Sequence, residues 1–197
     1  MKTLSIVTVA ALLFTPVAGG ADLLGIRAAN RVEGGDYSAR TKGSGNVANA
    51  ASIRINGGAA REVSNRVEAG GSVSASATGD NNTVNSASVM LENSSAEKVS
   101  NRVEVDTITN AVHGNDNVSN IGSVLMQNAT AGSVDSQVSG GRLEGVIRGN
   151  DNRLNIGSVQ MNDAHRGEVT TKTDLNDVSV SIGGDNTDIA VDSVVIE

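Results

Sequence analysis

The sequence contains no cysteine and no tryptophan, and only one proline, one tyrosine and one phenylalanine. Without cysteine no disulfide framework can support the fold, so hydrogen-bonded strands and stacked side chains must stabilise it. A compact β-sandwich or β-barrel normally fills a wide core with large aromatic rings. The near absence of rings therefore predicts a thin core built from Val, Ile, Leu, Met and Ala.

Excess positive charge and recognisable catalytic groups are missing as well. The formal net charge is −7, which argues against nucleic acid and against an anionic membrane surface as partners.

The histidines, His113 and His165, fall at different positions of the sequence pattern, and each is interpreted as an exposed turn or loop residue. No nucleophile elbow, Cys–His pair, metal-ligand cluster or phosphate loop occurs. We therefore predict that the chain is not an enzyme and needs no cofactor. A polysaccharide-acting β-helix enzyme would normally carry aromatic platforms for sugars, which this chain lacks.

No apolar run reaches the length of about 20 residues that a membrane-spanning helix needs. A short basic start is followed by an apolar run, Leu4 to Phe14, and then by small residues up to Ala21. This layout is typical of a secretory signal peptide that is cleaved near Gly20 or Ala21. We expect residues 1–21 to be this leader and residues 22–197 to form one secreted domain, extracellular or at the cell surface, without membrane insertion.

An internal repeat is the most prominent feature of the chain. Five diverged copies of a unit of about 35 residues fill approximately 28–63, 64–99, 100–134, 135–169 and 170–197. Their turn motifs begin at Gly43, Gly79, Gly114, Gly149 and Gly183. Nine residues after the first four glycines come Ser52, Ser88, Ser123 and Ser158, and the fifth serine, Ser193, requires a one-residue insertion. A fixed period of this size predicts units whose core exists only when the copies stack.

Each copy contains three short alternating segments separated by Gly, Asn, Asp and Ser. They are represented by Asn30–Glu33, by Ile108, Asn110 and Val112, and by Ala51, Ile53 and Ile55. Apolar residues two apart lie on one face of a strand, and the Gly, Asn, Ser and β-branched content disfavours helix. The sequence therefore predicts an all-β fold, a parallel β-solenoid whose equivalent strands pair about 4.8 Å apart. One coil of three strands per repeat and two coils of about 17 or 18 residues per repeat are both compatible with the pattern.

Two sets of asparagines recur at fixed repeat positions and are the candidate functional residues. The first set follows the turn glycine and comprises Asn46, Asn82, Asn117, Asn152 and Asn186. The second set comprises Asn49, Asn85, Asn120 and Asn155. In a stack of coils each amide can donate to the carbonyl of one neighbour and accept from the other. Asn also tolerates the left-handed backbone of turns, so we predict a structural role as turn and ladder.

Charged residues form columns of their own. Asp80, Asp116, Asp151 and Asp185 are expected to lie nearly in register, where they would repel one another or gather a cation such as calcium. Neither the nine-residue repeat of the calcium β-roll nor the EF-hand spacing occurs. A basic column is formed by Arg31, Arg66, Arg102 and Lys172, and an acidic column two positions further by Glu33, Glu68, Glu104 and Asp174. These columns are interpreted as exposed ion pairs worth about 0–1 kcal/mol each, or simply as a solvated face.

One copy contains Gly79-x-x-Asn82, then Ala87-x-Val89, and the later Asn93. In these motifs the repeats resemble those of bacterial functional amyloid subunits of the curli and Fap types. The resemblance implies a Gly-x-Gly-Asn-like turn, alternating strands, and inward columns of Asn and Gln in a self-assembling fibre. The present repeat is longer, and its glutamines are few (Gln127, Gln137 and Gln160). The Asn/Gly/Ser/Val-rich texture is also similar to that of secreted filamentous haemagglutinin-like adhesins.

Two functional hypotheses follow from the sequence. In the first, the protein is a secreted structural subunit that self-assembles by β-stacking into extracellular fibres, as in a functional amyloid or biofilm matrix, with itself or a related fibre subunit as partner. In the second, it is a monomeric β-helical adhesin or ligand-binding module at the cell surface, with a cell-surface or matrix polysaccharide as partner.

Overall fold

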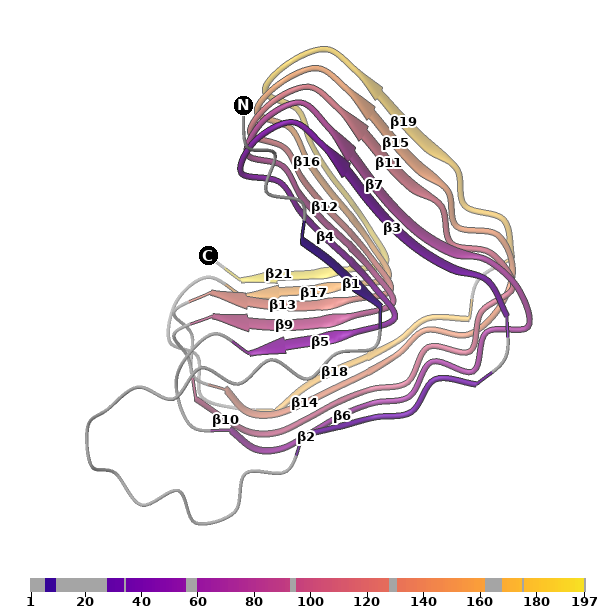
Figure 1. Ribbon diagram of the computed structural model, residues 1–197. Helices are drawn as coiled ribbons and strands as arrows, with labels where there is room; N and C mark the ends of the chain where they lie inside the picture. Colours follow the sequence, from indigo (N-terminus) through magenta and orange to yellow (C-terminus); the bar gives the residue numbers. More distant parts are fainter. Residues whose placement is uncertain are drawn as a thin grey trace.

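The computed structural model shows an all-β protein, and the described residues contain no helix. The prediction of a parallel β-solenoid is confirmed, because equivalent strands of successive repeats stack side by side in parallel sheets (Figure 1). No described segment forms an apolar helix of membrane-spanning length. The structure describes residues 6–9, 28–33, 35–55, 60–92, 95–127, 131–161, 168–174 and 176–196.

The strands of the described segments form four sheets, named A to D, which run along the solenoid. Sheet A contains β1 (Ile6–Val9), β4 (Val47–Ala50), β8 (Thr83–Ser86), β12 (Val118–Ile121), β16 (Arg153–Ile156) and β20 (Asp188–Val191). Sheet B contains β2 (Ala28–Asn30), β6 (Ala60–Asn65), β10 (Ala96–Asn101), β14 (Ala131–Gln137) and β18 (Val169–Lys172). Sheet C contains β3 (Tyr37–Lys42), β7 (Val73–Thr78), β11 (Asn110–His113), β15 (Gly145–Arg148) and β19 (Val180–Gly183). Sheet D contains β5 (Ile53–Ile55), β9 (Val89–Glu92), β13 (Val124–Gln127), β17 (Val159–Met161) and β21 (Val194–Ile196).

One repeat forms one coil, and the described residues of each coil contain four strands. Strands pair with their equivalents one repeat away, as Asn120 with Asn155, so the alternative of two coils per repeat is wrong. The prediction of three strands per coil is also wrong, because the turn is followed by a strand of its own in sheet A. A left-handed corner residue, with φ between 46° and 58°, then separates sheet A from sheet D. The corner residues are Ala51, Ala87, Gly122, Gly157 and Asp192.

The first predicted segment lies at a corner rather than in a strand. In the first copy β2 ends at Asn30, and Arg31–Glu33 follow it without strand structure. The valine of this segment is nevertheless buried in the next two copies, as Val67 and Val103. Alternation of buried and exposed residues therefore continues around the corner, and the sequence pattern alone does not mark the end of the strand.

The core is thin and divided between two limbs that meet at an angle (Figure 1). Sheets A and C enclose one cluster, which includes Val84, Val112 and Ile156. Sheets B and D enclose the other, which includes Val99 and Val124. Apart from Tyr37 at the first coil, these clusters consist of Val, Ile, Leu, Met and Ala. The core thus has the composition that the scarcity of aromatic residues predicts.

Candidate functional site: stacked polar columns and the two solenoid ends

The asparagines after the turn glycine form a continuous hydrogen-bonded column, which we call the turn column (Asn46, Asn82, Asn117 and Asn152). Asn82 donates from its backbone N and from its Nδ2 to Oδ1 of Asn46, both at 2.9 Å. Its Nδ2 also donates to the carbonyl oxygen of Gly114 in the following coil, at 2.7 Å. Asn117 and Asn152 repeat this pattern. Each of these buried amides therefore joins the coils before and after its own.

The fifth member of the turn column is Thr187, and the assignment of Asn186 to it is wrong. The backbone N of Thr187 donates to Oδ1 of Asn152 at 2.9 Å. Asn186 is exposed and has the left-handed φ of 54° that the residue before the column adopts in coils two to four. The leading glycine of the fifth turn is Gly184, so Ser193 follows it at the regular distance and no insertion is needed. The adjacent Gly183 conceals this register in the sequence.

The second predicted set forms a chain of side-chain amides on the outer face of sheet A, here called the groove column (Asn49, Asn85, Asn120 and Asn155). Its donor–acceptor distances, in chain order, are 2.8, 2.8 and 2.9 Å. The column lies in the angle between sheets A and D, where Nδ2 of Asn49 is 3.8 Å from Sδ of Met90. All four asparagines are buried. In the fifth coil Ala190 takes the register position of the asparagine, so the column ends at Asn155.

A third polar column, at the corner between sheets B and C, was not among the predicted site residues. Nδ2 of Asn30 donates to Oδ1 of Asn65, and Nδ2 of Asn65 to Oδ1 of Asn101, both at 2.8 Å. Asn101 then donates to Oγ of Ser136 at 3.3 Å. Thr171 follows in register, and its Oγ1 is buried without a hydrogen-bond partner among the described residues. The signal in the sequence is the Asn that precedes each of the first three Arg-Val-Glu motifs.

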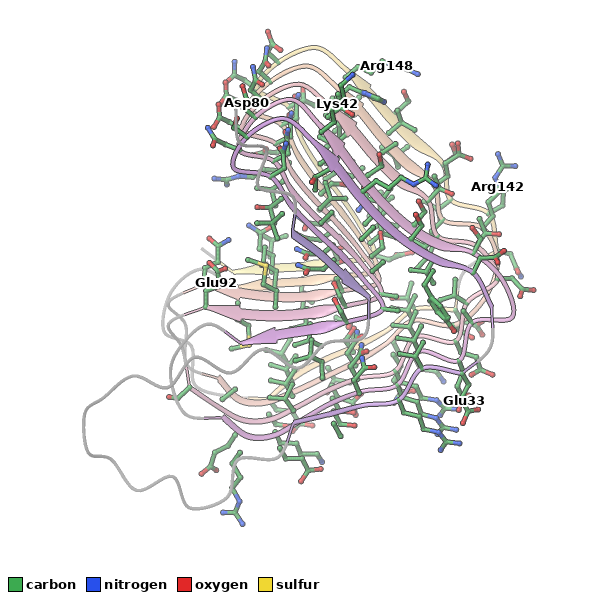
Figure 2. The ribbon with its side chains drawn as sticks, viewed as in Figure 1. Glu33, Lys42, Asp80, Glu92, Arg142 and Arg148 are labelled. Carbon is green, nitrogen blue, oxygen red and sulfur yellow. The ribbon has the colours of Figure 1, made fainter. Side chains whose placement is uncertain are left out.

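A fourth column stands at the first turn position (Ser44, Asp80, Asn115, Asn150 and Asp185). The backbone N of each of the first four donates to the side-chain oxygen of the next, over 2.6 to 3.0 Å. Both Asp and Asn occur as acceptors here because either side chain offers the required oxygen. Figure 2 shows Asp80 at this exposed turn.

The acidic turn residues do not form the single column that the sequence predicts. Asp80 and Asp185 belong to the first turn position, whereas Asp116 and Asp151 occupy the second, with φ of 57° and 56°. Within the described segments no group of three or more His, Cys, Asp or Glu residues is placed to hold a metal ion. His113 lies at the exposed end of β11, before the turn, and His165 lies outside the described residues.

The charged columns at the corner pair within each of the first three coils. Arg31 bonds Glu33, Arg66 bonds Glu68, and Arg102 lies 3.5 Å from Glu104. In the fourth coil Ser139 aligns with Glu104, and the ion pair lies further along the chain. It joins Arg142, three residues after Ser139 and pointing outward, to Glu144 at 2.8 Å (Figure 2). Lys172 and Asp174 are both exposed. These pairs face solvent, which screens their attraction.

We expect the double variant Arg102→Gln/Glu104→Gln to change the free energy of unfolding by less than about 1 kcal/mol, because both side chains are half exposed. Urea unfolding of the double variant and of both single variants, followed by far-UV circular dichroism, gives the coupling energy of the pair. A coupling above about 1.5 kcal/mol would contradict the interpretation of these columns as a solvated face.

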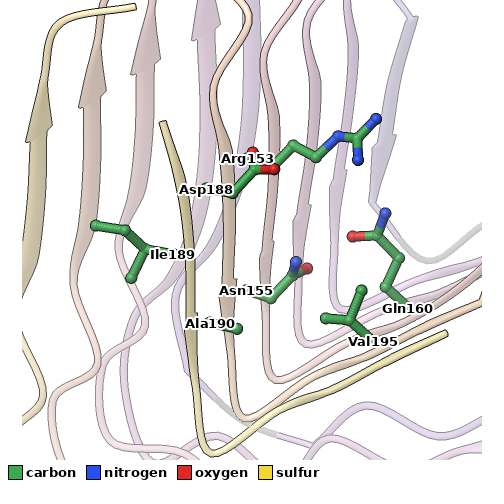
Figure 3. Close-up of a pocket in the computed structure, with 7 residues that line it drawn as sticks. All are labelled: Arg153, Asn155, Gln160, Asp188, Ile189, Ala190 and Val195. Atoms are coloured by element: carbon green, nitrogen blue, oxygen red, sulfur yellow. The ribbon is translucent and has the colours of Figure 1, made fainter. Parts of the chain in front are cut away.

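A small cavity opens where the groove column ends (Figure 3). It measures about 270 Å³ and is lined by Arg153, Asn155, Gln160, Asp188, Ile189, Ala190 and Val195. Oε1 of Gln160 is buried and has no hydrogen-bond partner among the described residues. The cavity exists because the fifth coil places the small Ala190 where earlier coils have asparagine. It is smaller than most small-molecule sites, which measure roughly 300–1,000 Å³.

Fold and columns together define a parallel β-solenoid whose coils are joined by polar ladders. A scan against protein-family models, a search of curated proteins and a search of solved structures found no match to this chain. The functional argument therefore depends on the geometry of the columns and of the solenoid ends.

Proposed function

We propose that the protein is a secreted structural subunit that self-assembles by stacking head to tail into extracellular fibres, in the manner of a functional amyloid or biofilm matrix component. The observation that carries this proposal is that the corner column and the column at the first turn position each run in one direction from the first coil to the fifth and leave complementary groups at the two ends. The resemblance of the repeats to curli and Fap subunits supports the same function.

The corner column illustrates this complementarity. Its last residue, Thr171, has a buried hydroxyl without a partner among the described residues. Its first residue, Asn30, lies on β2, the edge strand of sheet B, and its Nδ2 already donates into the second coil. A second copy stacked in the same register places the Oδ1 of its Asn30 over the hydroxyl of Thr171. Stacking thus supplies the partner that a buried polar group requires.

The first turn position gives a second match. In this column a backbone N–H donates to the side chain one coil further along, and at Asn150 the side-chain Nδ2 also donates to Asp185 at 3.2 Å. Asp185 lies in the last described coil, so its own N–H faces the open end. Ser44 of a second copy would present a hydroxyl there, as Asp80 presents a carboxylate to Ser44 within the chain.

Strand edges and apolar side chains at the last coil favour stacking as well. β18, β19, β20 and β21 are the terminal strands of their sheets. Val178, Val180 and Ile189 are only partly buried, although equivalent residues of inner coils lie deep in the core. Exposed, flat strand edges act as templates for further pairing. Because the two ends of one molecule differ, such contacts are heterologous and generate an open filament.

The glycine that leads each turn provides a test of this stacking. A Cβ on Gly149 would overlap the carbonyl oxygen of Gly184 in the next coil, whereas a Cβ on Gly184 meets nothing within 4 Å. In a head-to-tail filament Gly43 of a second copy would lie over Gly184. The turn-leading glycines thus form a glycine column (Gly43, Gly79, Gly114, Gly149 and Gly184). The variant Gly184→Ala should remain folded and fail to form fibres. Gly183 lies outside this column and an added Cβ there meets nothing within 4 Å, so Gly183→Ala should form fibres normally.

The measurement uses residues 22–197 of the parent and of both variants, transferred from denaturant into neutral buffer and examined by electron microscopy and sedimentation after a day. Circular dichroism of the soluble fraction checks that each variant is folded. Unbranched fibrils from the parent and from Gly183→Ala, but not from Gly184→Ala, are expected. A parent that persists as a monodisperse particle would overturn the proposal. Fibrils from Gly184→Ala would overturn the in-register contact.

The second candidate function is a monomeric adhesin, and the cavity beside Asn155 and Gln160 favours it. An unpartnered buried amide oxygen and a neighbouring asparagine suit a polyhydroxy ligand such as a saccharide. A monodisperse parent chain that binds cells or matrix polysaccharide, and loses binding when Gln160 is replaced by Leu, would support this function.

A further inference from the structure

The N-terminal edge of sheet A differs from the other N-terminal edges, because a strand from the predicted leader already lies on it. β1 pairs in parallel with β4, with Ile6 opposite Val47 and Val9 opposite Ala50 (Figure 1). Sheets B, C and D begin instead with strands of the first repeat, namely β2, β3 and β5. β1 belongs to residues 1–21, whereas the predicted cleavage position near Gly20 or Ala21 lies outside the described residues.

β1 occupies the register that the last strand of another copy would take on β4. The second and fourth residues of β4 are buried alanines, which lie opposite Val7 and Val9 of β1. The second and fourth residues of β20 are Ile189 and Val191, which pack against the core of the same limb. In β1 the residues opposite the two alanines of β4 are therefore β-branched. The residues at the same two positions of β20 are β-branched as well.

We infer that the edge of β4 that pairs with β1 is the docking surface for β20 of a second copy of this chain, and that β1 covers this edge until the leader is removed. This inference rests on the proposed function, since it assigns the regulation of the same stacking contact. The occupant is a second copy because β1 reproduces both the parallel direction and the register of the coil-to-coil contacts in sheet A. Stacking through sheet A is then slow until the leader is cleaved.

The hydrogen-bond pattern of sheet A shows which backbone groups the leader strand uses. Val47 and Arg153, at equivalent positions, direct their N–H groups to the following coil, where they bond the carbonyl oxygens of Asn82 and Thr187. Ile6 holds this same position in β1, and Thr8, two residues later, has the same orientation of its N–H group. Thr8→Pro removes this donor and prevents pairing, whereas Thr8→Ala retains it.

The test compares four chains at equal concentration in neutral buffer: residues 22–197, the full chain, and the full chain with Thr8→Pro or with Thr8→Ala. Assembly is followed by sedimentation and electron microscopy. Residues 22–197 and the Thr8→Pro chain are expected to assemble at the same rate. The full chain and its Thr8→Ala variant should assemble about tenfold more slowly, which corresponds to β1 covering the edge of β4 in about nine molecules of ten. As a second measurement, a peptide of residues 4–11 added to residues 22–197 should slow assembly, and the same peptide with Thr8→Pro should not.

The outcomes separate this inference from the proposed function. Equal assembly rates of the full chain and residues 22–197, with no effect of the peptide, overturn the inference and leave the proposed function standing. Equally slow assembly of the full chain and its Thr8→Pro variant also overturns it, because the leader would then act without pairing. Failure of residues 22–197 to assemble overturns the proposed function and this inference together.

Discussion

The variant Asn117→Asp is expected to lose at least about 3 kcal/mol of stability at neutral pH. Nδ2 of Asn117 donates to Oδ1 of Asn82 at 3.0 Å and to the carbonyl oxygen of Gly149 at 2.9 Å. A carboxylate at this buried position has no proton to donate, so its oxygen would face two acceptor oxygens without compensation. Urea unfolding followed by far-UV circular dichroism measures the loss.

The variant Asn115→Asp is the matched control, because it adds the same charge to the same turn. Asn115 is exposed, and only its Oδ1 is used, as acceptor for the backbone N of Asp80 at 2.8 Å. Asp185 already fills this role two coils further along, accepting from the backbone N of Asn150. Asn115→Asp should therefore change stability by about 1 kcal/mol or less. Equal losses in the two variants would show that added charge, rather than the turn column, decides stability.

The pH dependence of Asn117→Asp gives an independent check. Burial and the facing oxygens favour the neutral carboxyl group, so its pKa in the folded state should lie above the unfolded value of about 4. A raised folded pKa means that the destabilisation is complete above that pKa and diminishes as the pH falls toward the unfolded value, where the proton restores one donor. A loss that stays constant down to pH of about 4 would contradict the hydrogen-bond assignment.

The class of fold can be predicted from the sequence because stacking makes each copy repeat the same constraints. Apolar residues at equivalent positions, such as Val89, Val124 and Val159, lie opposite one another in sheet D. The number of strands per coil cannot be predicted in this way, since the alternation of Ala51, Ile53 and Ile55 continues across a left-handed corner. The only hint is that Gly122 and Gly157 replace alanine at that corner, and glycine adopts positive φ without strain.

The polar columns could be predicted where their residue type is constant and were missed where it varies. The turn and groove columns are visible as asparagines at fixed distances after glycine, apart from the fifth coil, where two adjacent glycines obscure the register. The corner column changes from Asn101 to Ser136 and Thr171. The position requires a side-chain oxygen, which several residue types supply, so no single residue type recurs in the sequence. The first turn position likewise varies between Asp and Asn, because only an acceptor is required.

The variant Gly149→Ala should lose about 2–3 kcal/mol more stability than Gly184→Ala. The two substitutions differ only in whether a following coil lies next to the new Cβ. The φ angles of Gly149 and Gly184 are 142° and 143°, so the backbone strain of an alanine, about 1–3 kcal/mol, is common to both. Only at Gly149 does the new Cβ overlap the backbone of the following coil, at the carbonyl oxygen of Gly184. This overlap cannot be relieved by rotating a side chain, so the last coil must move away.

Amide hydrogen exchange shows which strands are destabilised, whereas urea unfolding gives only the total loss of stability. In Gly149→Ala the amides of β19 and β20, which bond the fourth coil, should lose protection, while those of β7 and β8 should keep it. In Gly184→Ala both sets should remain protected in the monomer. Equal stability and equal protection in the two variants would mean that the coils can separate at the turn without cost. In that case the glycine column would not set the spacing of the stack, and Gly184→Ala could not prevent fibre growth through this contact.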